Sequence, residues 1–340
     1  MKAIGFKTSL PITEKDSLIK FDMPTPVPQG HDILVKVHAV SVNPVDCKVR
    51  SGSAKNVELE VPRILGYDAS GVVEAVGENV TCFEPGDEVY YAGDINRAGS
   101  NAEYQLVDER IVGFKPECLK FTEAAAVPLT MLTAWELIFD RIMLAKSPQK
   151  THDIETALVI SGAGGVGSMA IQLLKKRTNI KIIATASRKE SSDWCKKMGA
   201  DLIIDHNNLI DNIKNNGIDN VDYIFNFVST DMYWEQMCQL IKPQGRIGCI
   251  VGTSKELNLG LLFNKSVSFS WELMFTRPTF KTSDMNRQQV ILNEVSGLID
   301  NDAIKPTVTK RLKGFSVENF KEAHQILESG KSIGKIVVEY

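Results

Sequence analysis

The first third of the chain alternates short apolar runs with turn-forming residues. The runs that predict strands lie at residues 33–42, 71–76 and 87–92. Clusters of proline and glycine separate them, for example at residues 24–30 and in Glu84-Pro-Gly-Asp87. This pattern predicts a small, irregular, barrel-like β domain.

The pattern changes from about residue 122, where long helical segments begin to alternate with strands. A helix is predicted at 123–139 and a polar loop at 146–155. Further on, strands are predicted at 157–161, 181–186, 202–205, 222–228, 246–251 and 266–273, and helices at 166–177, 190–198 and 232–241. Several of these strands are apolar on both faces, as a parallel sheet covered by helices requires.

The last part of the chain returns to a mixture of strand and helix. A helix is predicted at 285–299 and strands at 308–313 and 335–339. We expect this part to rejoin the first domain. The prediction is thus an α/β chain with one domain at residues 1–125, completed by 275–340, and a second at 126–274.

A glycine-rich loop follows the predicted strand at 157–161 and opens the next helix. Its residues are Gly162-Ala-Gly-Gly-Val-Gly167. In this motif the first glycine allows a tight turn, the second lets a pyrophosphate approach the backbone, and the third lets helix and strand pack closely. The helix N-terminus adds unpaired N–H groups. We predict a dinucleotide site at Gly162, Gly164, Gly165, Val166 and Gly167 rather than a merely structural turn.

The end of the second strand of such a unit decides which dinucleotide binds. An Asp or Glu there would accept hydrogen bonds from a ribose hydroxyl, but this chain has Ser187, Arg188 and Lys189. A carboxylate would repel a 2′-phosphate by about 4 kcal/mol at 4 Å and an effective dielectric near 20. Arg188 can instead fork onto phosphate oxygens, which favours NADPH. The alternative is that these residues are solvated positions opening the next helix.

Composition excludes several classes of protein. The 340 residues carry a net charge of −3 with no basic cluster, so we expect no nucleic-acid partner. No apolar run reaches the roughly 18 residues of a membrane span, and the first residues do not form a signal peptide. Six cysteines without a C-x-x-C pair indicate reduced thiols. A cytoplasmic protein with no membrane partner is expected.

Taken together, the motifs resemble the medium-chain dehydrogenase/reductase superfamily, most closely its zinc-independent quinone oxidoreductase branch. The supporting stretches are 43–50 (NPVDCKVR), 66–77 (GYDASGVVEAVG), 85–87 (PGD), 133–135 (TAW), 162–167, 198–201 (MGAD) and 334–337 (GKIV). The resemblance spans the whole chain. It implies a GroES-like, barrel-shaped catalytic domain, an inserted doubly wound Rossmann domain, a substrate cleft between them, and a homodimer that extends the Rossmann sheet across its last strand.

The chain departs from zinc alcohol dehydrogenases at the zinc ligands. Those enzymes have Cys-His-x-Asp where this chain has Asn43-Pro-Val-Asp46, and Gly-His-Glu where it has Gly66-Tyr-Asp68. Residues 94–104 contain no cysteine, so the four-thiolate structural site is also missing. Cys47, Asp46, Asp68 and His38 offer suitable ligand atoms, but their spacing does not support a site. We predict no bound metal.

Without a metal, hydride must meet a carbon that is already electrophilic, as in quinones and α,β-unsaturated carbonyls. Negative charge then collects on the substrate oxygen, where hydrogen-bond donors are needed. The resemblance implies Asn43 and Tyr67 as these donors. It also implies Thr133 beside the nicotinamide, although a threonine inside a helix that bonds a carbonyl would look the same in sequence. Either Tyr67 or solvent supplies the proton, and the competing interpretation is a tyrosine packed in the barrel.

Four further residues each have two interpretations. We place Asp46 at the substrate pocket and expect it to anchor backbone N–H groups in the turn after Pro44 rather than act as a base. Lys335 reaches cofactor phosphate or is solvated. Trp271 and Phe275 line an apolar substrate pocket or pack in a core or dimer interface.

The leading hypothesis is an NADPH-dependent, zinc-free reductase of quinones or enones. One alternative is a zinc alcohol dehydrogenase with non-standard ligands such as Cys47 and Asp68. The other is a non-catalytic NADPH-binding or sensor protein, because a fold and a cofactor loop do not establish catalysis.

Overall fold

The computed structural model describes residues 1–145 and 154–340, which form two compact units. Unit 1 comprises residues 1–129 and 275–340, and unit 2 comprises residues 130–274. The first boundary thus follows residue 129, where the sequence prediction had 125, and the second follows residue 274 in both. Most of the predicted polar loop at 146–155 lies outside the described residues.

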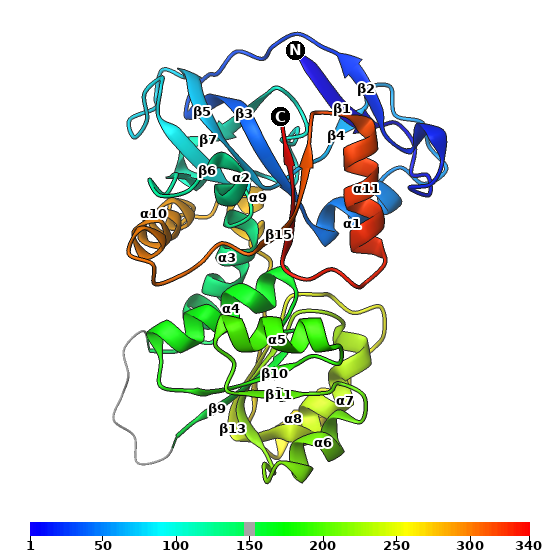
Figure 1. Ribbon diagram of the computed structural model, residues 1–340, viewed down its shortest axis with the longest axis vertical. Coiled ribbons are helices and arrows are strands. Elements are labelled where there is room, and N and C mark those ends of the chain that lie inside the picture. Colours follow the sequence, from blue (N-terminus) through cyan, green and yellow to red (C-terminus); the bar gives the residue numbers. More distant parts are fainter. Residues whose placement is uncertain (146–153) are drawn as a thin grey trace. The chain divides into compact units, whose positions relative to one another are not determined.

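Unit 2 is built on a six-stranded parallel sheet (Figure 1), with the strand order β11-β10-β9-β12-β13-β14. The strands are β9 (Thr156–Ile160), β10 (Lys181–Thr185), β11 (Leu202–Ile204), β12 (Val221–Asn226), β13 (Ile241–Cys249) and β14 (Ser268–Trp271). The helices that connect them are α4 (Gly165–Arg177), α5 (Lys189–Met198), α6 (Leu209–Asn215), α7 (Thr230–Leu240) and α8 (Gly260–Phe263). β9 and β12 are almost entirely buried because helices cover the sheet. The predicted doubly wound fold is confirmed.

The helix predicted at 123–139 is correct from residue 128 onward but is broken before it. The structure has α2 (Phe121–Ala124), α3 (Pro128–Trp135) and the π-helical segment η3 (Glu136–Arg141). Pro128 explains the break, because proline has no N–H to donate and disfavours helical backbone at the residue before it. As the first residue of α3, proline is well placed to begin a new helix.

Unit 1 holds a barrel-like sheet that the C-terminal segment completes; its pairs are antiparallel except for the parallel pair β15–β16. The main path runs β15-β16-β3-β5-β6-β8, with β7 also paired to β3, and a smaller sheet runs β2-β1-β4. Their bounds are β1 (Lys2–Phe6), β2 (Ile19–Asp22), β3 (Asp32–Val42), β4 (Arg63–Ile64), β5 (Ala69–Val76), β6 (Glu88–Tyr91), β7 (Tyr104–Asp108), β8 (Val112–Phe114), β15 (Val308–Lys313) and β16 (Lys335–Glu339). Because β16 pairs with β3, the predicted return of the C-terminus to the first domain is confirmed.

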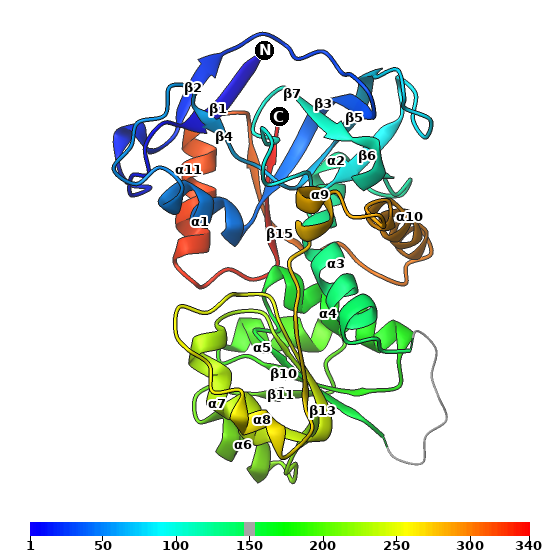
Figure 2. The ribbon, with the colours of Figure 1, turned by 180° about the vertical axis from the view of Figure 1, so that it is seen from behind.

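Two helices of unit 1 that the sequence analysis did not identify lie side by side, α1 (Pro44–Gly52) and α11 (Val317–Glu328), as Figures 1 and 2 show. The signals for both starts are local. Asn43 precedes Pro44, and the Asn43 N–H donates to Asp46 Oδ2 at 2.8 Å, while Ser316 caps α11 by accepting from the Asn319 N–H. Unit 1 also contains α9 (Thr276–Phe280), α10 (Arg287–Asp300) and the short 3-10 helices η1 (Lys15–Ser17) and η2 (Glu109–Ile111). No helix within the described ranges is long and apolar enough to cross a bilayer.

Candidate functional site

The glycine loop of unit 2 sits where the motif predicts, between β9 and α4. A Cβ on Gly167 would lie 2.3 Å from the Ser161 carbonyl oxygen, and one on Gly162 would lie 2.9 Å from the Ala184 Cβ. These two glycines are therefore required by close packing. A Cβ on Gly164 would meet nothing nearer than 3.5 Å, and Gly164 is partly exposed, so its backbone can be approached from outside. This is the position at which the motif lets a pyrophosphate approach.

The residue with left-handed backbone conformation in this loop is Ser161, not one of the glycines. Ser161 has φ +68°, whereas none of the loop glycines has a positive φ. Its N–H donates to Thr185 Oγ1 at 2.9 Å, which fastens the start of the loop to the end of β10. The tight turn that the sequence analysis assigned to Gly162 is thus made one residue earlier. Strained backbone of this kind needs support from its surroundings, and the Thr185 contact supplies it.

A second contact fastens the first turn of α4. Ser168 Oγ donates to the Gly164 carbonyl at 2.7 Å, and Trp194 Nε1 of α5 donates to Ser168 Oγ at 2.8 Å. The loop is therefore tied both to β10 and to α5. With the partial positive charge of the α4 N-terminus, this arrangement fits a dinucleotide phosphate.

The predicted ribose-phosphate residues follow β10 directly. Arg188 precedes the first turn of α5, and Ser191 Oγ caps that turn by accepting from the Arg188 N–H at 3.2 Å, while it also donates to the Arg188 carbonyl. Lys189 is 85% exposed and its Nζ lies 2.6 Å from Asp193 Oδ2. An ion pair as exposed as this one contributes little to stability, so the Lys189 ammonium can leave Asp193 for another anion. Ser187 is exposed at the same strand end, where no carboxylate precedes α5.

Unit 1 brings three of the predicted site residues into one buried group with Asp68. We call Asn43, Asp46, Asp68 and Lys335 the buried polar network. Lys335 Nζ lies 3.0 Å from Asp68 Oδ2 and donates to Asn43 Oδ1. Asn43 Nδ2 donates to Asp68 Oδ2 at 2.8 Å and to the Ser41 carbonyl at 3.2 Å. Both amide hydrogens of Asn43 are used, so the structure does not favour its predicted role as a donor to substrate.

Lys335 is predicted from the sequence to reach cofactor phosphate or to be solvated, and the structure supports neither. Its side chain is 3% exposed, and its ammonium faces Asp68, Asn43 and the Val42 carbonyl. An ammonium group has three hydrogens, and these three acceptors take them all. The structure therefore favours an internal role over contact with cofactor phosphate, because a phosphate contact would require breaking a buried ion pair.

Asp46 is the backbone anchor that the sequence analysis expected. Its Oδ2 accepts from the Asn43 N–H at 2.8 Å and its Oδ1 accepts from the Gly66 N–H at 2.9 Å. Burial raises the pKa of Asp46 to about 7, while the two backbone N–H groups and Lys335 oppose that rise. With both oxygens bonded to backbone, Asp46 holds the turn rather than acting as a base.

Tyr67 lies between these anchors, and its ring is 1% exposed. It packs edge-on against Phe275, with the ring centroids 5.3 Å apart, so Phe275 and Tyr67 share one apolar surface. Burial raises the pKa of Tyr67 to about 12, and the Asp46 carboxylate adds to the rise while Arg63 opposes it. Within the described part of the chain the phenolic oxygen has no hydrogen-bond partner at normal distance, and Arg63 is the cation that acts on it from farther away. A buried hydroxyl of this kind is a donor that a substrate oxygen could satisfy.

The other two predicted site residues belong to unit 2. Thr133 is buried in α3. Trp271 ends β14, is 44% exposed and packs edge-on against Phe269 at 4.8 Å. Their roles beside the nicotinamide and in a substrate pocket stay predictions.

Two family descriptions match the chain. The Alcohol dehydrogenase GroES-like domain matches residues 29–134, and Zinc-binding dehydrogenase matches residues 198–338. The chain is similar to a zinc-type alcohol dehydrogenase-like protein of Staphylococcus epidermidis, with 44% identity over 339 residues that cover 99% of each protein. It is 31% identical to the 2-methylene-furan-3-one reductase of Solanum lycopersicum over 315 residues, covering 90% of this chain and 71% of that protein.

A crystal structure from Rhizobium etli, described as a zinc-dependent alcohol dehydrogenase protein, has the same fold. It superposes with a TM-score of 0.94 and 46% identity, covering 100% of this chain and 98% of that one. The N-terminal match agrees with the barrel of unit 1, and the C-terminal match includes most of the strands of unit 2.

The zinc in these descriptions does not fit the residues of this chain at the two positions where zinc enzymes carry ligands. Asn43 has its amide hydrogens bonded to Ser41 and Asp68, and Tyr67 offers a phenol whose pKa is raised. Asp68 already faces the Lys335 ammonium at 3.0 Å. A catalytic zinc requires three N, S or O ligands free to bind it.

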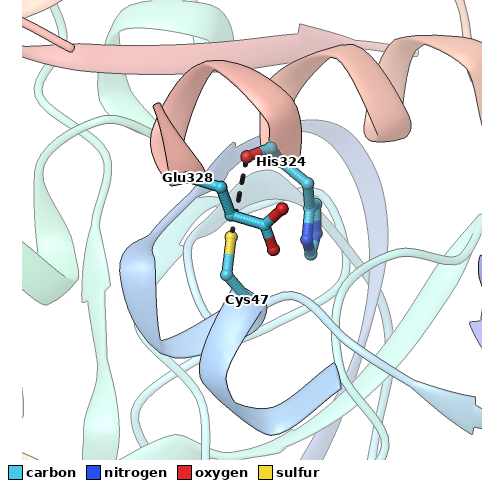
Figure 3. Close-up of side chains that lie close together, drawn as sticks. All are labelled: Cys47, His324 and Glu328. Atoms are coloured by element: carbon cyan, nitrogen blue, oxygen red, sulfur yellow. Dashed lines mark hydrogen bonds between the residues drawn. The ribbon is translucent and has the colours of Figure 1, made fainter. Parts of the chain in front are cut away.

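One other cluster has ligand types suited to a metal, and Figure 3 shows it between α1 and α11. Ligand atoms of Cys47, His324 and Glu328 lie within 4.8 Å of one another. However, the buried Arg50 guanidinium pairs with Glu328 and donates to His324 Nδ1 at 3.4 Å. The Arg50 guanidinium already pairs with the Glu328 carboxylate, and its positive charge would repel a metal cation. The cluster is therefore better described as a contact between α1 and α11 that is centred on Arg50.

The remaining candidate ligands are also separated. His38 stacks on Phe121 with ring centroids 4.5 Å apart, and Asp46 and Asp68 are held by the contacts above. Burial raises the pKa of the Cys47 thiol to about 12, so this cysteine is a poor metal ligand and a poor nucleophile.

Proposed function

Because the chain belongs to the medium-chain dehydrogenase/reductase superfamily, whose members are NAD(P)-dependent oxidoreductases, we propose that it is an NADPH-dependent reductase of quinones or α,β-unsaturated carbonyls that works without zinc. The observation that carries the proposal is Tyr67. It stands where zinc enzymes carry a histidine ligand, and its buried hydroxyl is available to an acceptor.

The residues that would hold the cofactor are those of unit 2 described above. Gly164 offers an open approach to the backbone, and the α4 N-terminus would face the phosphates. Arg188 would bind the 2′-phosphate, with Ser187 and Lys189 beside it. When bound, NADPH supplies a hydride to an electrophilic carbon.

Tyr67 would act on the substrate oxygen. As hydride reaches the β-carbon of an enone or the ring of a quinone, negative charge moves onto that oxygen, and the Tyr67 hydroxyl donates a hydrogen bond to it. Since its pKa is raised to about 12, Tyr67 is a better hydrogen-bond donor than a proton source. Solvent therefore completes the reaction by protonating the enolate or hydroquinone anion. Phe275 packs beside the ring and would contact the apolar part of the substrate.

The similarity to a 2-methylene-furan-3-one reductase supports an enone substrate. The test is oxidation of NADPH and of NADH by protein treated with a chelator, with a simple quinone and a simple enone as acceptors and with zinc measured in the same sample. Turnover that prefers NADPH in zinc-free protein is expected. Activity with an alcohol that requires stoichiometric zinc would instead support the zinc alcohol dehydrogenase. Tight NADPH binding without hydride transfer to any acceptor would support a sensor.

The proposed enzyme is a homodimer. β14 ends the strand order of unit 2, and within the described residues it pairs only with β13. Its second edge is thus available for pairing with β14 of another copy. Sedimentation equilibrium is expected to give twice the chain mass of 37.6 kDa, and a monomer at micromolar concentration would contradict this.

A further inference from the structure

The buried polar network joins four parts of unit 1 that are distant in sequence. Lys335 comes from β16, Asp68 from the segment before β5, Asn43 from the start of α1, and Leu129 from α3. Asp68 is the centre: its Oδ2 faces Lys335 and Asn43, and its Oδ1 accepts from the Leu129 N–H at 2.7 Å. Asp68 and Lys335 are both almost completely buried.

The network holds the backbone on both sides of Tyr67. On one side, the Gly66 N–H donates to Asp46 Oδ1 at 2.9 Å. On the other, Asp68 is fixed by the contacts just described, and its carbonyl accepts from the Ser41 N–H at 3.1 Å. The side chains of the network are bonded to one another or to backbone, whereas the Tyr67 hydroxyl beside them is not.

The backbone at Gly66 is held in one conformation by its close neighbours. Its φ is +103°, and a Cβ there would lie 2.4 Å from Ser100 Oγ and 2.8 Å from the Asn101 nitrogen. The Ser100 and Asn101 N–H groups also donate to the carbonyls of Gly66 and Leu65. The backbone contacts on either side therefore fix the direction of the Tyr67 side chain.

We propose that Lys335, acting through Asp68, is a positioning residue that fixes Tyr67 for the reduction proposed above, on which this inference rests. Lys335 touches neither substrate nor cofactor in this role. It neutralises the buried Asp68 carboxylate, and the pair keeps residues 66–68 in place. Because a displacement of about 1 Å at a reacting group can cost ~100-fold in rate, loss of the pair should appear in kcat.

The variants that test the proposal are Lys335→Met, Asp68→Asn and the double variant, each made also with Tyr67→Phe. Lys310→Met is the matched control, because Lys310 pairs with Glu322 at 3.0 Å on the surface of the neighbouring strand β15. We expect Lys335→Met to lower kcat about tenfold or more while the NADPH dissociation constant, measured by fluorescence titration without substrate, stays within about twofold. In the Tyr67→Phe background, Lys335→Met should lower kcat by less than about twofold further, because its effect on kcat depends on the Tyr67 hydroxyl.

Two results would overturn the proposal. A weakening of NADPH binding equal to the loss in kcat would make Lys335 a cofactor ligand, and full additivity with Tyr67→Phe would make its role unrelated to Tyr67. The double variant removes both charges of the Asp68–Lys335 pair, so it should recover part of kcat. If Lys335→Met does not fold, the double variant takes its place in these comparisons.

Hydrogen exchange separates this inference from the proposed function. In cofactor-free protein, Lys335→Met should raise amide exchange in peptides covering residues 64–69, and Lys310→Met should not. If the wild-type protein reduces no acceptor, the proposed function fails whatever the exchange data show. Unchanged exchange at 64–69 in active protein would refute the positioning role alone.

Discussion

Replacing Tyr67 by phenylalanine is expected to stabilise the folded protein and to slow the reaction. Only the hydroxyl is lost, since the edge-on contact of the ring with Phe275 at 5.3 Å is kept. That hydroxyl is buried without a hydrogen-bond partner among the described residues, and leaving such a group unsatisfied costs about 1–3 kcal/mol. We expect the free energy of unfolding to rise by about 1 kcal/mol.

The effect on the reaction has the opposite sign. Removing one donor to a developing oxyanion costs about 10²- to 10³-fold in well-studied enzymes. Here the raised pKa leaves proton delivery to solvent, so Tyr67 contributes a hydrogen bond only. We expect kcat to fall about 10- to 100-fold, with turnover slowed but not abolished.

Tyr90→Phe is the control, because Tyr90 is equally buried but its hydroxyl donates to the Leu292 carbonyl at 2.6 Å. This variant should lose about 1 kcal/mol of stability and keep its kcat. Chemical denaturation measures the stabilities, and steady-state NADPH oxidation measures the rates. If Tyr67→Phe destabilises the protein as much as Tyr90→Phe does, the Tyr67 hydroxyl is satisfied inside the protein and is not available to a substrate.

Three further predictions concern the cofactor site and the acid range. Arg188→Glu should weaken NADPH binding by about 100-fold or more and change NADH binding little, because a carboxylate repels the 2′-phosphate by about 4 kcal/mol at 4 Å. Isothermal titration measures both affinities, and equal losses of affinity for the two cofactors would contradict this prediction. Gly164→Ala should fold normally but bind NADPH poorly, as titration with NADPH can measure. Gly167→Ala should instead lose stability, because its Cβ would lie 2.3 Å from the Ser161 carbonyl oxygen, and thermal unfolding followed by circular dichroism measures that loss. Burial lowers the pKa of His324 to about 3, so the unfolded state binds its proton first and stability should fall as the pH drops from about 6.5 towards 3. Denaturation of wild type and His324→Gln between pH 4.5 and 7.5 measures this, and equal slopes would refute it.

The sequence predicts the parallel unit well because its signals are local. Strands buried on both faces read as continuous apolar runs, and the glycine motif marks the turn between β9 and α4. The errors arise where one residue overrides a helical pattern. Pro128 splits the predicted helix at 123–139, although the apolar periodicity continues through it.

The candidate site in unit 1 depends on contacts between distant residues, and these are much harder to predict. Nothing near Lys335 in the sequence shows that its ammonium meets Asp68, which is 267 positions earlier. The same holds for Asn43, which resembles an oxyanion donor in sequence but uses its amide inside the network. By contrast, the expected bonding of Asp46 to backbone N–H groups in the turn at Pro44 is a local contact, and its bond from the Asn43 N–H agrees with that expectation.

Transfer of deuterium tests the central claim most directly. Zinc-free protein is incubated with NADPH deuterated at the transferable position and with an enone, and the product is analysed by NMR. The account predicts deuterium on the β-carbon, faster with NADPH than with NADH, in protein that contains no zinc. The account is contradicted if deuterium reaches the β-carbon only after zinc is added, or if no deuterium reaches it and no quinone is reduced while the protein binds NADPH tightly.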